Sequence, residues 1–229
     1  MQSYLDPDSG KSREIDVLAR DPDFLGIVDT KFAVECKASK KPWVLLCSSQ
    51  TLSGYNRLFA FAPMSDDCRH VLADRLVELL DKIPWLKKDL FAGYSFRQAH
   101  AEPSLDPAYS AAMSAAKASD YLVREIPDQY NPPYSLGFPV IVVDSPLLQG
   151  SLTQDGSIVL EEVRQGEFLF FAALPRQFGS CIRIITADYL SEFAIEAKQV
   201  ADRIRDELKN EETKVRESWR ERFSDIGVV

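Results

Sequence analysis

Two short segments near the start of the chain carry an aspartate, a glutamate and a lysine at spacings that allow joint chemistry. Asp16 interrupts an otherwise apolar stretch over residues 15–19, and Glu35 and Lys37 lie two positions apart within residues 32–38. Both segments have strand-like composition, so Glu35 and Lys37 project from one face, about 7 Å apart along the strand. If the two strands pair as a hairpin, Asp16 comes near Glu35. Two carboxylates and an ammonium are the equipment of a divalent-metal site that hydrolyses a phosphodiester.

This pattern resembles a known signature. Asp16 is followed nineteen residues later by Glu35-x-Lys37, which is similar to the PD-(D/E)XK motif of restriction-endonuclease-like nucleases. Residues 10–19 look like the second core strand of that family, and residues 34–44 look like its third. The resemblance implies an α/β fold with a restriction-endonuclease-like three-layer core, in which helices flank a central mixed β-sheet.

The resemblance also implies roles for individual residues. In this family the two acids hold Mg²⁺, with Mn²⁺ as a substitute ion, and the carbonyl between the Glu and the Lys often adds a ligand. The expected ligands are therefore Asp16, Glu35 and the backbone carbonyl of Cys36. Lys37 is expected to orient or deprotonate the attacking water, or to stabilise charge. The expected activity is a Mg²⁺-dependent nuclease that acts on DNA.

Other interpretations of the same residues stay open. Asp16 is also compatible with an exposed edge-strand charge, and Glu35 with Lys37 is compatible with an ordinary ion pair worth less than about 1 kcal/mol. A further alternative is a noncatalytic nuclease-fold domain that binds nucleic acid or a protein partner. The family usually has a helix before its first core strand, for which this sequence leaves no room. Asp6 and Asp8 have turn chemistry and are not assigned to the site.

The distribution of charge bears on the partner. The net charge of −8 argues against broad nonspecific wrapping of nucleic acid. Residues 31–57 nevertheless contain five basic side chains and one acid, which leaves +4 around the proposed site. Lysines and arginines beside a phosphoryl-transfer centre are candidate phosphate contacts, and those nearest in the sequence are Lys11, Arg13, Lys40 and Lys41.

Composition bounds the class of protein. The 229 residues fit a single domain, with a core over about 1–190. No apolar run approaches the roughly 18 residues that a membrane helix needs, and the N-terminus lacks the apolar segment of a signal peptide. Four widely spaced cysteines without a Cys-x-x-Cys pair indicate a reducing, cytoplasmic setting. Cys36 itself is interpreted as a small core residue.

The remaining pattern predicts the elements around the site. Residues 66–83 and the alanine-rich residues 109–123 read as helices, and the aromatic residues between them read as a loop. A mixed-charge helix is expected over 187–223, where a homodimer or protein contact is left open. The additional strands are expected at 41–47, 137–144, 158–163, 167–173 and 181–186.

Overall fold

The computed structural model describes residues 2–6, 8–48, 50–51, 62–73, 75, 82–83, 85, 92–102, 106–124, 131–153, 155–173 and 177–225. The strands of this part are β1 (Gln2–Leu5), β2 (Ser12–Ile15), β3 (Val17–Pro22), β4 (Val28–Lys37), β5 (Trp43–Ser48), β6 (Ala92–Gln98), β7 (Tyr134–Val143), β8 (Leu147–Leu152), β9 (Ile158–Val163), β10 (Gln165–Ala173) and β11 (Gln177–Thr186). The helices are α2 (Asp66–Ala73), α4 (Pro107–Val123), α5 (Leu190–Glu207) and α6 (Lys209–Asp225), with a 3₁₀ turn η2 (Ala187–Tyr189).

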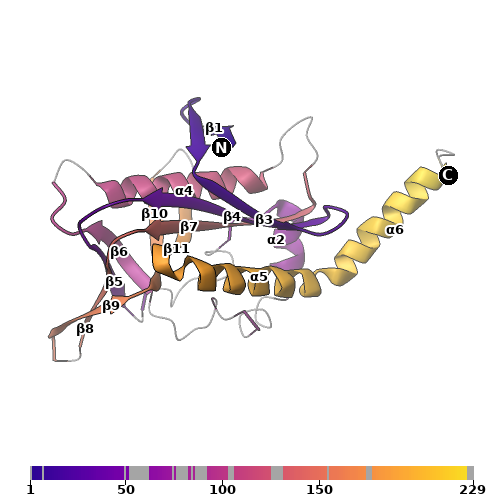
Figure 1. Cartoon of the computed structure of the whole chain (residues 1–229). Coiled ribbons are helices and arrows are strands. Elements are labelled where there is room, and N and C mark those ends of the chain that lie inside the picture. Colours follow the sequence, from indigo (N-terminus) through magenta and orange to yellow (C-terminus); the bar gives the residue numbers. More distant parts are fainter. Residues whose placement is uncertain are drawn as a thin grey trace.

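One mixed sheet organises the described part of the chain. Nine strands follow the order β3-β4-β7-β11-β10-β6-β5-β8-β9, and β1 with β2 forms a separate hairpin. Strand β4 pairs antiparallel with β3 and parallel with β7. Helix α4 covers one face of the sheet and α5 covers the other (Figure 1). This arrangement confirms the expected α/β class, with a mixed sheet between helices.

Strand β4 presents alternate side chains to the two helical layers. Phe32 and Val34 belong to the core cluster that includes the buried face of α5. Ala33 instead packs in a cluster with residues of α4. Because successive side chains of a strand point to opposite faces, Glu35 and Lys37 share the α4 side of the sheet with Ala33.

Helix α4 lies close to the central strand. Its first turn is capped by Asp106, whose carboxylate accepts the Tyr109 N–H at 2.9 Å, and Pro107 occupies the first helical position. The alanines of its buried face let it approach β7, where every residue is buried. A Cβ at Gly137 would lie 2.7 Å from the Ser119 carbonyl oxygen, so this contact requires glycine.

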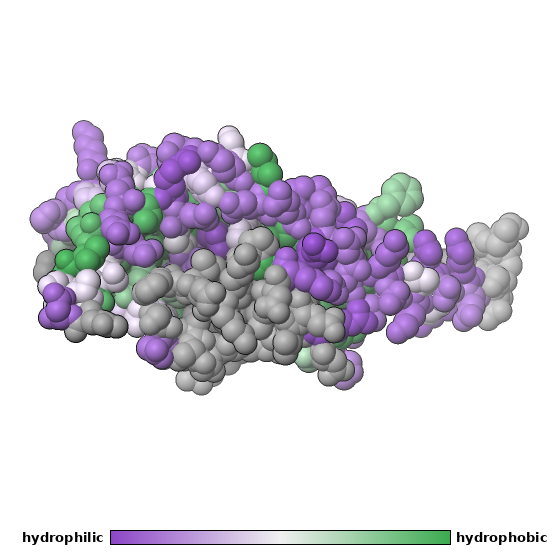
Figure 2. Space-filling view, turned by 90° about the horizontal axis from the view of Figure 1, so that it is seen from below, coloured by the Kyte–Doolittle hydropathy of each residue, from purple (hydrophilic) through white to green (hydrophobic). Residues whose placement is uncertain are grey.

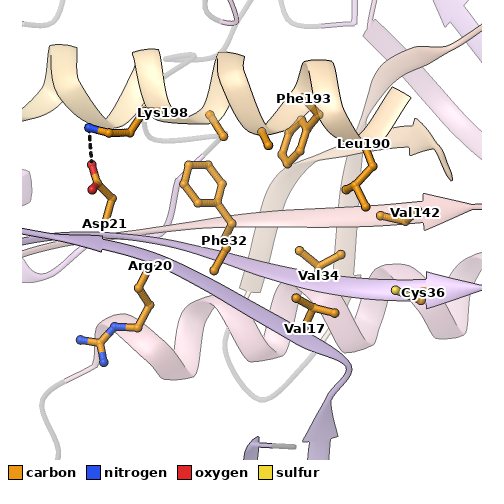
Figure 3. Close-up of a pocket in the computed structure, with 13 residues that line it drawn as sticks. Val17, Arg20, Asp21, Phe32, Val34, Cys36, Val142, Leu190, Phe193 and Lys198 are labelled. Atoms are coloured by element: carbon orange, nitrogen blue, oxygen red, sulfur yellow. Dashed lines mark hydrogen bonds and ion pairs between the residues drawn. The ribbon is translucent and has the colours of Figure 1, made fainter. Parts of the chain in front are cut away.

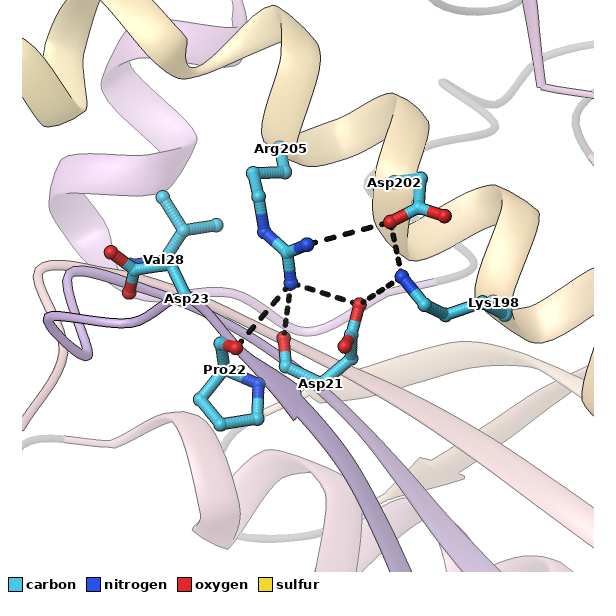
Figure 4. Close-up of polar contacts among 7 residues, drawn as sticks. All are labelled: Asp21, Pro22, Asp23, Val28, Lys198, Asp202 and Arg205. Carbon is cyan, nitrogen blue, oxygen red and sulfur yellow. Dashed lines mark hydrogen bonds and ion pairs between the residues drawn. The ribbon is translucent and has the colours of Figure 1, made fainter.

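Polar contacts fix α5 against the end of β3 (Figure 4). Arg205 Nη2 donates to the Asp21 carboxylate at 2.9 Å and also reaches the carbonyl oxygens of Asp21 and Pro22. Lys198 Nζ lies 3.5 Å from the same carboxylate. Helix α5 is thereby held behind the β3–β4 pair, on the side opposite Glu35.

The C-terminal helix α6 extends away from the sheet (Figure 1). Seen from below, its surface is almost entirely hydrophilic (Figure 2), which agrees with the mixed-charge surface expected there. Among the described elements, no helix has the length and apolar character needed to cross a membrane.

Several predicted elements need correction. The single helix expected over 187–223 is divided at Leu208, which is fully buried and lies between α5 and α6. The loop expected around Tyr94 and Phe96 is wrong, because β6 occupies this region between β5 and β10. Strands β1 and β8 were not predicted. Of the helix expected at 66–83, the structure shows α2, and most of the remainder lies outside the described residues.

Asp6 organises the turn between β1 and β2. Its buried carboxylate accepts hydrogen bonds from the Asp8 N–H at 3.1 Å and the Ser9 hydroxyl at 2.9 Å. It also pairs with Arg13 at 2.6 Å and with Lys117 of α4 at 3.0 Å. Burial alone would raise the pKa of Asp6, but the hydrogen bonds from Arg13 and Lys117 outweigh it and hold the pKa well below its ordinary value. The expected turn is confirmed, and it ties the hairpin to α4.

Replacing this carboxylate should destabilise the protein in a pH-dependent way. We expect Asp6→Asn to lower the free energy of unfolding by about 2 kcal/mol at pH 7, because charged hydrogen bonds are lost. Since the folded-state pKa is depressed, the wild-type carboxylate stabilises the fold above its unfolded-state pKa of about 4 and loses this contribution as the pH falls. Urea unfolding between pH 7 and pH 3 should show the two proteins converging. A constant difference would contradict the assignment.

Candidate metal-binding site

Asp16 lies at the bend between β2 and β3, opposite Glu35. The antiparallel register pairs Val17 with Val34, and continuing it by one residue places Asp16 across from Glu35. Asp16 Oδ2 accepts a hydrogen bond from the backbone N–H of Cys36 at 2.8 Å. The sequence predicted a strand running through Asp16, whereas the structure breaks the strand there. The Asp16 carboxylate accepts the Cys36 N–H in place of the backbone carbonyl that a continuous β-ladder would provide.

Glu35 and Lys37 form an ion pair on the face that carries α4. Lys37 Nζ lies 2.6 Å from Glu35 Oε1, and the two side chains are 31% and 12% exposed, respectively. Burial raises the pKa of Glu35, the hydrogen bond and charge of Lys37 lower it, and the negative charge of Asp16 raises it. The structure therefore brings the three predicted catalytic residues to the same end of the β3–β4 pair.

The donor atoms at this end fit a hard divalent cation. In an antiparallel ladder the N–H and C=O of one residue point toward the same neighbouring strand, so the Cys36 carbonyl is directed to the side of Asp16. Carboxylate and carbonyl oxygens are the ligands that Mg²⁺ takes, and it keeps several waters. Within the described ranges, no group of three or more His, Cys, Asp or Glu side chains is arranged to hold a metal ion. The protein ligands at this end would therefore be two carboxylates, of Asp16 and Glu35, and this carbonyl oxygen.

The four side chains predicted to contact phosphate differ in their exposure and in their partners. Arg13 is paired with Asp6, and Lys41 Nζ donates to the backbone carbonyl of His100 at 2.7 Å. Lys11 and Lys40 are exposed. Lys11 lies beside the β1–β2 turn, at the end of the hairpin away from Asp16. Lys40 follows β4 and lies closer along the chain to the candidate site.

The positive charge around the site is smaller than the sequence count of +4 suggested. Lys31 is 5% exposed and donates to the Leu122 carbonyl at 2.7 Å and the Ser135 hydroxyl at 2.6 Å. Burial lowers the pKa of Lys31, while its ion pair with Asp29 raises it. Lys31 is therefore part of the interior, and Arg57 lies outside the described residues.

An apolar pocket of about 300 Å³ lies behind the site, between β3, β4 and α5 (Figure 3). Val17 and Val34 line it from the sheet, and Leu190 and Phe193 line it from the helix. Cys36 also lines it, on the face opposite Glu35 as expected, but it is exposed and not a core residue. The pocket joins segments far apart in the chain, so the sequence carried no sign of it.

Tyr4 is a neighbour of the site that sequence reasoning missed. It lies on β1, in a cluster with Ile15, which precedes Asp16 in the chain, and with Ala33, which shares a face of β4 with Glu35. A tyrosine in a short N-terminal segment gives no local signal of such a role. Only the pairing of β1 with β2 brings it there.

Neither a protein-family model, nor a curated protein, nor a solved structure matches this chain. The function of the site is therefore inferred from its residues and their geometry.

Proposed function

We propose that this chain is a divalent-metal-dependent phosphodiester hydrolase of the PD-(D/E)XK type that cleaves DNA. The observation that carries the proposal is the β3–β4 register, which places Asp16 opposite Glu35 with Lys37 on the face of Glu35. Two carboxylates and one ammonium at the same end of a strand pair are the minimal set for this chemistry. The restriction-endonuclease-like form of the fold is part of the same proposal, supported by the mixed sheet with helices on both faces.

Each residue then has a defined task. Asp16 and Glu35 would hold Mg²⁺ or Mn²⁺ together with the Cys36 carbonyl. A bound ion would supply a water of lowered pKa and offset charge on the scissile phosphate. Lys37 orients the attacking water or stabilises the charge that develops on the phosphate. The exposed side chain of Lys40 contacts a neighbouring phosphate.

The ion pair between Glu35 and Lys37 sets the resting arrangement. At 2.6 Å the two groups neutralise one another, and neither is then directed at a substrate. Glu35 would give up this partner if both of its carboxylate oxygens turned to a bound cation, and Lys37 would then be free to approach the phosphate. Binding of an ion and positioning of the lysine would in that case be coupled.

A cleavage assay tests the proposal directly. Purified protein should be incubated with plasmid, linear duplex, single-stranded DNA and RNA, each with Mg²⁺, with Mn²⁺ and with EDTA. We expect ion-dependent cleavage of DNA that disappears with EDTA and in the Asp16→Asn variant. If all four substrates survive both ions at high protein concentration, the catalytic proposal fails.

The second candidate is a noncatalytic domain of this fold that binds nucleic acid or a protein partner. The Glu35–Lys37 ion pair and the internal engagement of Arg13, Lys31 and Lys41 favour it, because among the described residues they leave few cationic side chains without a partner near the site. Such a domain would shift labelled DNA in a gel without cutting it. Binding that persists in Asp16→Asn, with no cleavage by the wild type, would select this function.

A further inference from the structure

Tyr4 carries a buried hydroxyl that no described residue satisfies. The residue is 4% exposed, and its ring packs on Tyr121 with centroids 4.8 Å apart. Within the part of the chain that the structure describes, the Tyr4 hydroxyl has no hydrogen-bond partner. Burying a hydroxyl without a partner costs free energy, and phenylalanine would fill the same space without that cost. The unpaired hydroxyl therefore indicates a function that the contacts of the resting structure do not explain.

The position of Tyr4 indicates where that role lies. Its ring packs with Ile15 and Ala33. Ile15 directly precedes Asp16, and Ala33 points to the same face of β4 as Glu35, two residues further on. The tyrosine thus packs between the β1–β2 hairpin and α4, on the face of β4 that also carries the half-buried Glu35.

The hydroxyl is available as a donor at any working pH. Burial raises the pKa of Tyr4 well above its ordinary value, Arg13 opposes this, and the negative charges of Asp6, Glu35 and Asp120 raise it further. A protonated phenol beside a carboxylate is a natural hydrogen-bond donor to it.

We propose that the Tyr4 hydroxyl is a positioning group that donates a hydrogen bond to the Glu35 carboxylate when Glu35 turns from Lys37 to hold a divalent ion. The inference rests on the proposed function. Carboxylates that ligate metals are held by surrounding donors, and loss of such a donor weakens metal binding. In the resting structure Lys37 pairs with one oxygen of Glu35 at 2.6 Å, and the Tyr4 hydroxyl has no hydrogen-bond partner among the described residues. On ion binding it takes over as the donor that fixes Glu35.

The Tyr4→Phe variant tests this role with Tyr121→Phe as the matched control. Mn²⁺ affinity should be measured from the electron paramagnetic resonance signal of the free ion, with and without a short DNA duplex. We expect Tyr4→Phe to bind Mn²⁺ about 10- to 100-fold more weakly. Without the ion, its melting temperature should equal or exceed that of the wild type, because an unsatisfied hydroxyl is removed. Tyr121→Phe should leave the Mn²⁺ affinity unchanged.

The outcomes separate this inference from the proposed function. If the wild type binds Mn²⁺ and Tyr4→Phe binds it equally well, the role of Tyr4 is overturned and the nuclease proposal stands. A Tyr4→Phe variant that is less stable without the ion would show a structural hydroxyl, which also overturns the role. If the wild type binds no Mn²⁺ with or without DNA and cleaves no substrate, both proposals fail together.

Discussion

The Asp16→Asn variant should cleave DNA, the proposed substrate, about 10³-fold more slowly than the wild type. It should also lose most of its affinity for divalent ions while keeping its fold. Asparagine preserves the side-chain oxygen that accepts the Cys36 N–H, a hydrogen bond of 2.8 Å in the wild type. What it removes is the negative charge that an ion would neutralise. A bound metal ion lowers the activation free energy of phosphodiester hydrolysis by several kcal/mol through charge stabilisation. A loss of that size slows the reaction by about 10³-fold.

Asparagine is a sharper test than alanine. Because the Asp16 carboxylate replaces a backbone acceptor at the break between β2 and β3, Asp16→Ala removes a structural hydrogen bond together with the charge. Loss of activity in Asp16→Ala alone would not distinguish the two causes. Asp16→Asn separates them, provided that its urea unfolding curve overlays that of the wild type.

Initial rates of plasmid cleavage and Mn²⁺ affinity are the two measurements for this variant. Asp202→Asn is the control, because Asp202 lies on α5, is half exposed and contacts Lys198 on the opposite side of the sheet. It should cleave and bind at the wild-type level. An Asp16→Asn protein that cleaves as fast as the wild type would exclude Asp16 as a metal ligand.

The side chains of β4 show what the sequence could predict about this site. The two-residue period of a strand was enough to place Glu35 and Lys37 on one face and Cys36 on the other. The pairing of the two segments was a condition of the prediction, and the antiparallel β3–β4 register confirms it. The alternation of side chains, in contrast, depends on local geometry alone.

The features that the sequence could not predict depend on tertiary contacts. A count of charges treats every lysine as exposed, yet Lys31 is covered by the end of α4 and donates to Leu122. The break at Asp16 depends on a hydrogen bond to a residue twenty positions away. Strand β6 was mistaken for a loop because its backbone is stabilised by β5 and β10, which are remote in sequence.

Replacing Lys37 with methionine should separate ion binding from catalysis. Methionine retains an unbranched side chain of similar length but removes the ammonium that lies 2.6 Å from Glu35. Since the lysine competes with a cation for this carboxylate, Lys37→Met should bind Mn²⁺ at least as tightly as the wild type at neutral pH. Its cleavage rate should nevertheless fall by about 10²- to 10⁴-fold, the usual contribution of a positioned acid–base group.

Lys214→Met is the matched control for this substitution. Lys214 is on α6, its side chain is 74% exposed, and it lies outside the sheet that carries the site. Its replacement should change neither Mn²⁺ affinity nor cleavage. The comparison also distinguishes the two candidate functions, because in a noncatalytic domain the wild type and both lysine variants would all fail to cleave DNA. If Lys37→Met loses ion binding along with cleavage, Lys37 supports the fold of the site and does not act on the substrate.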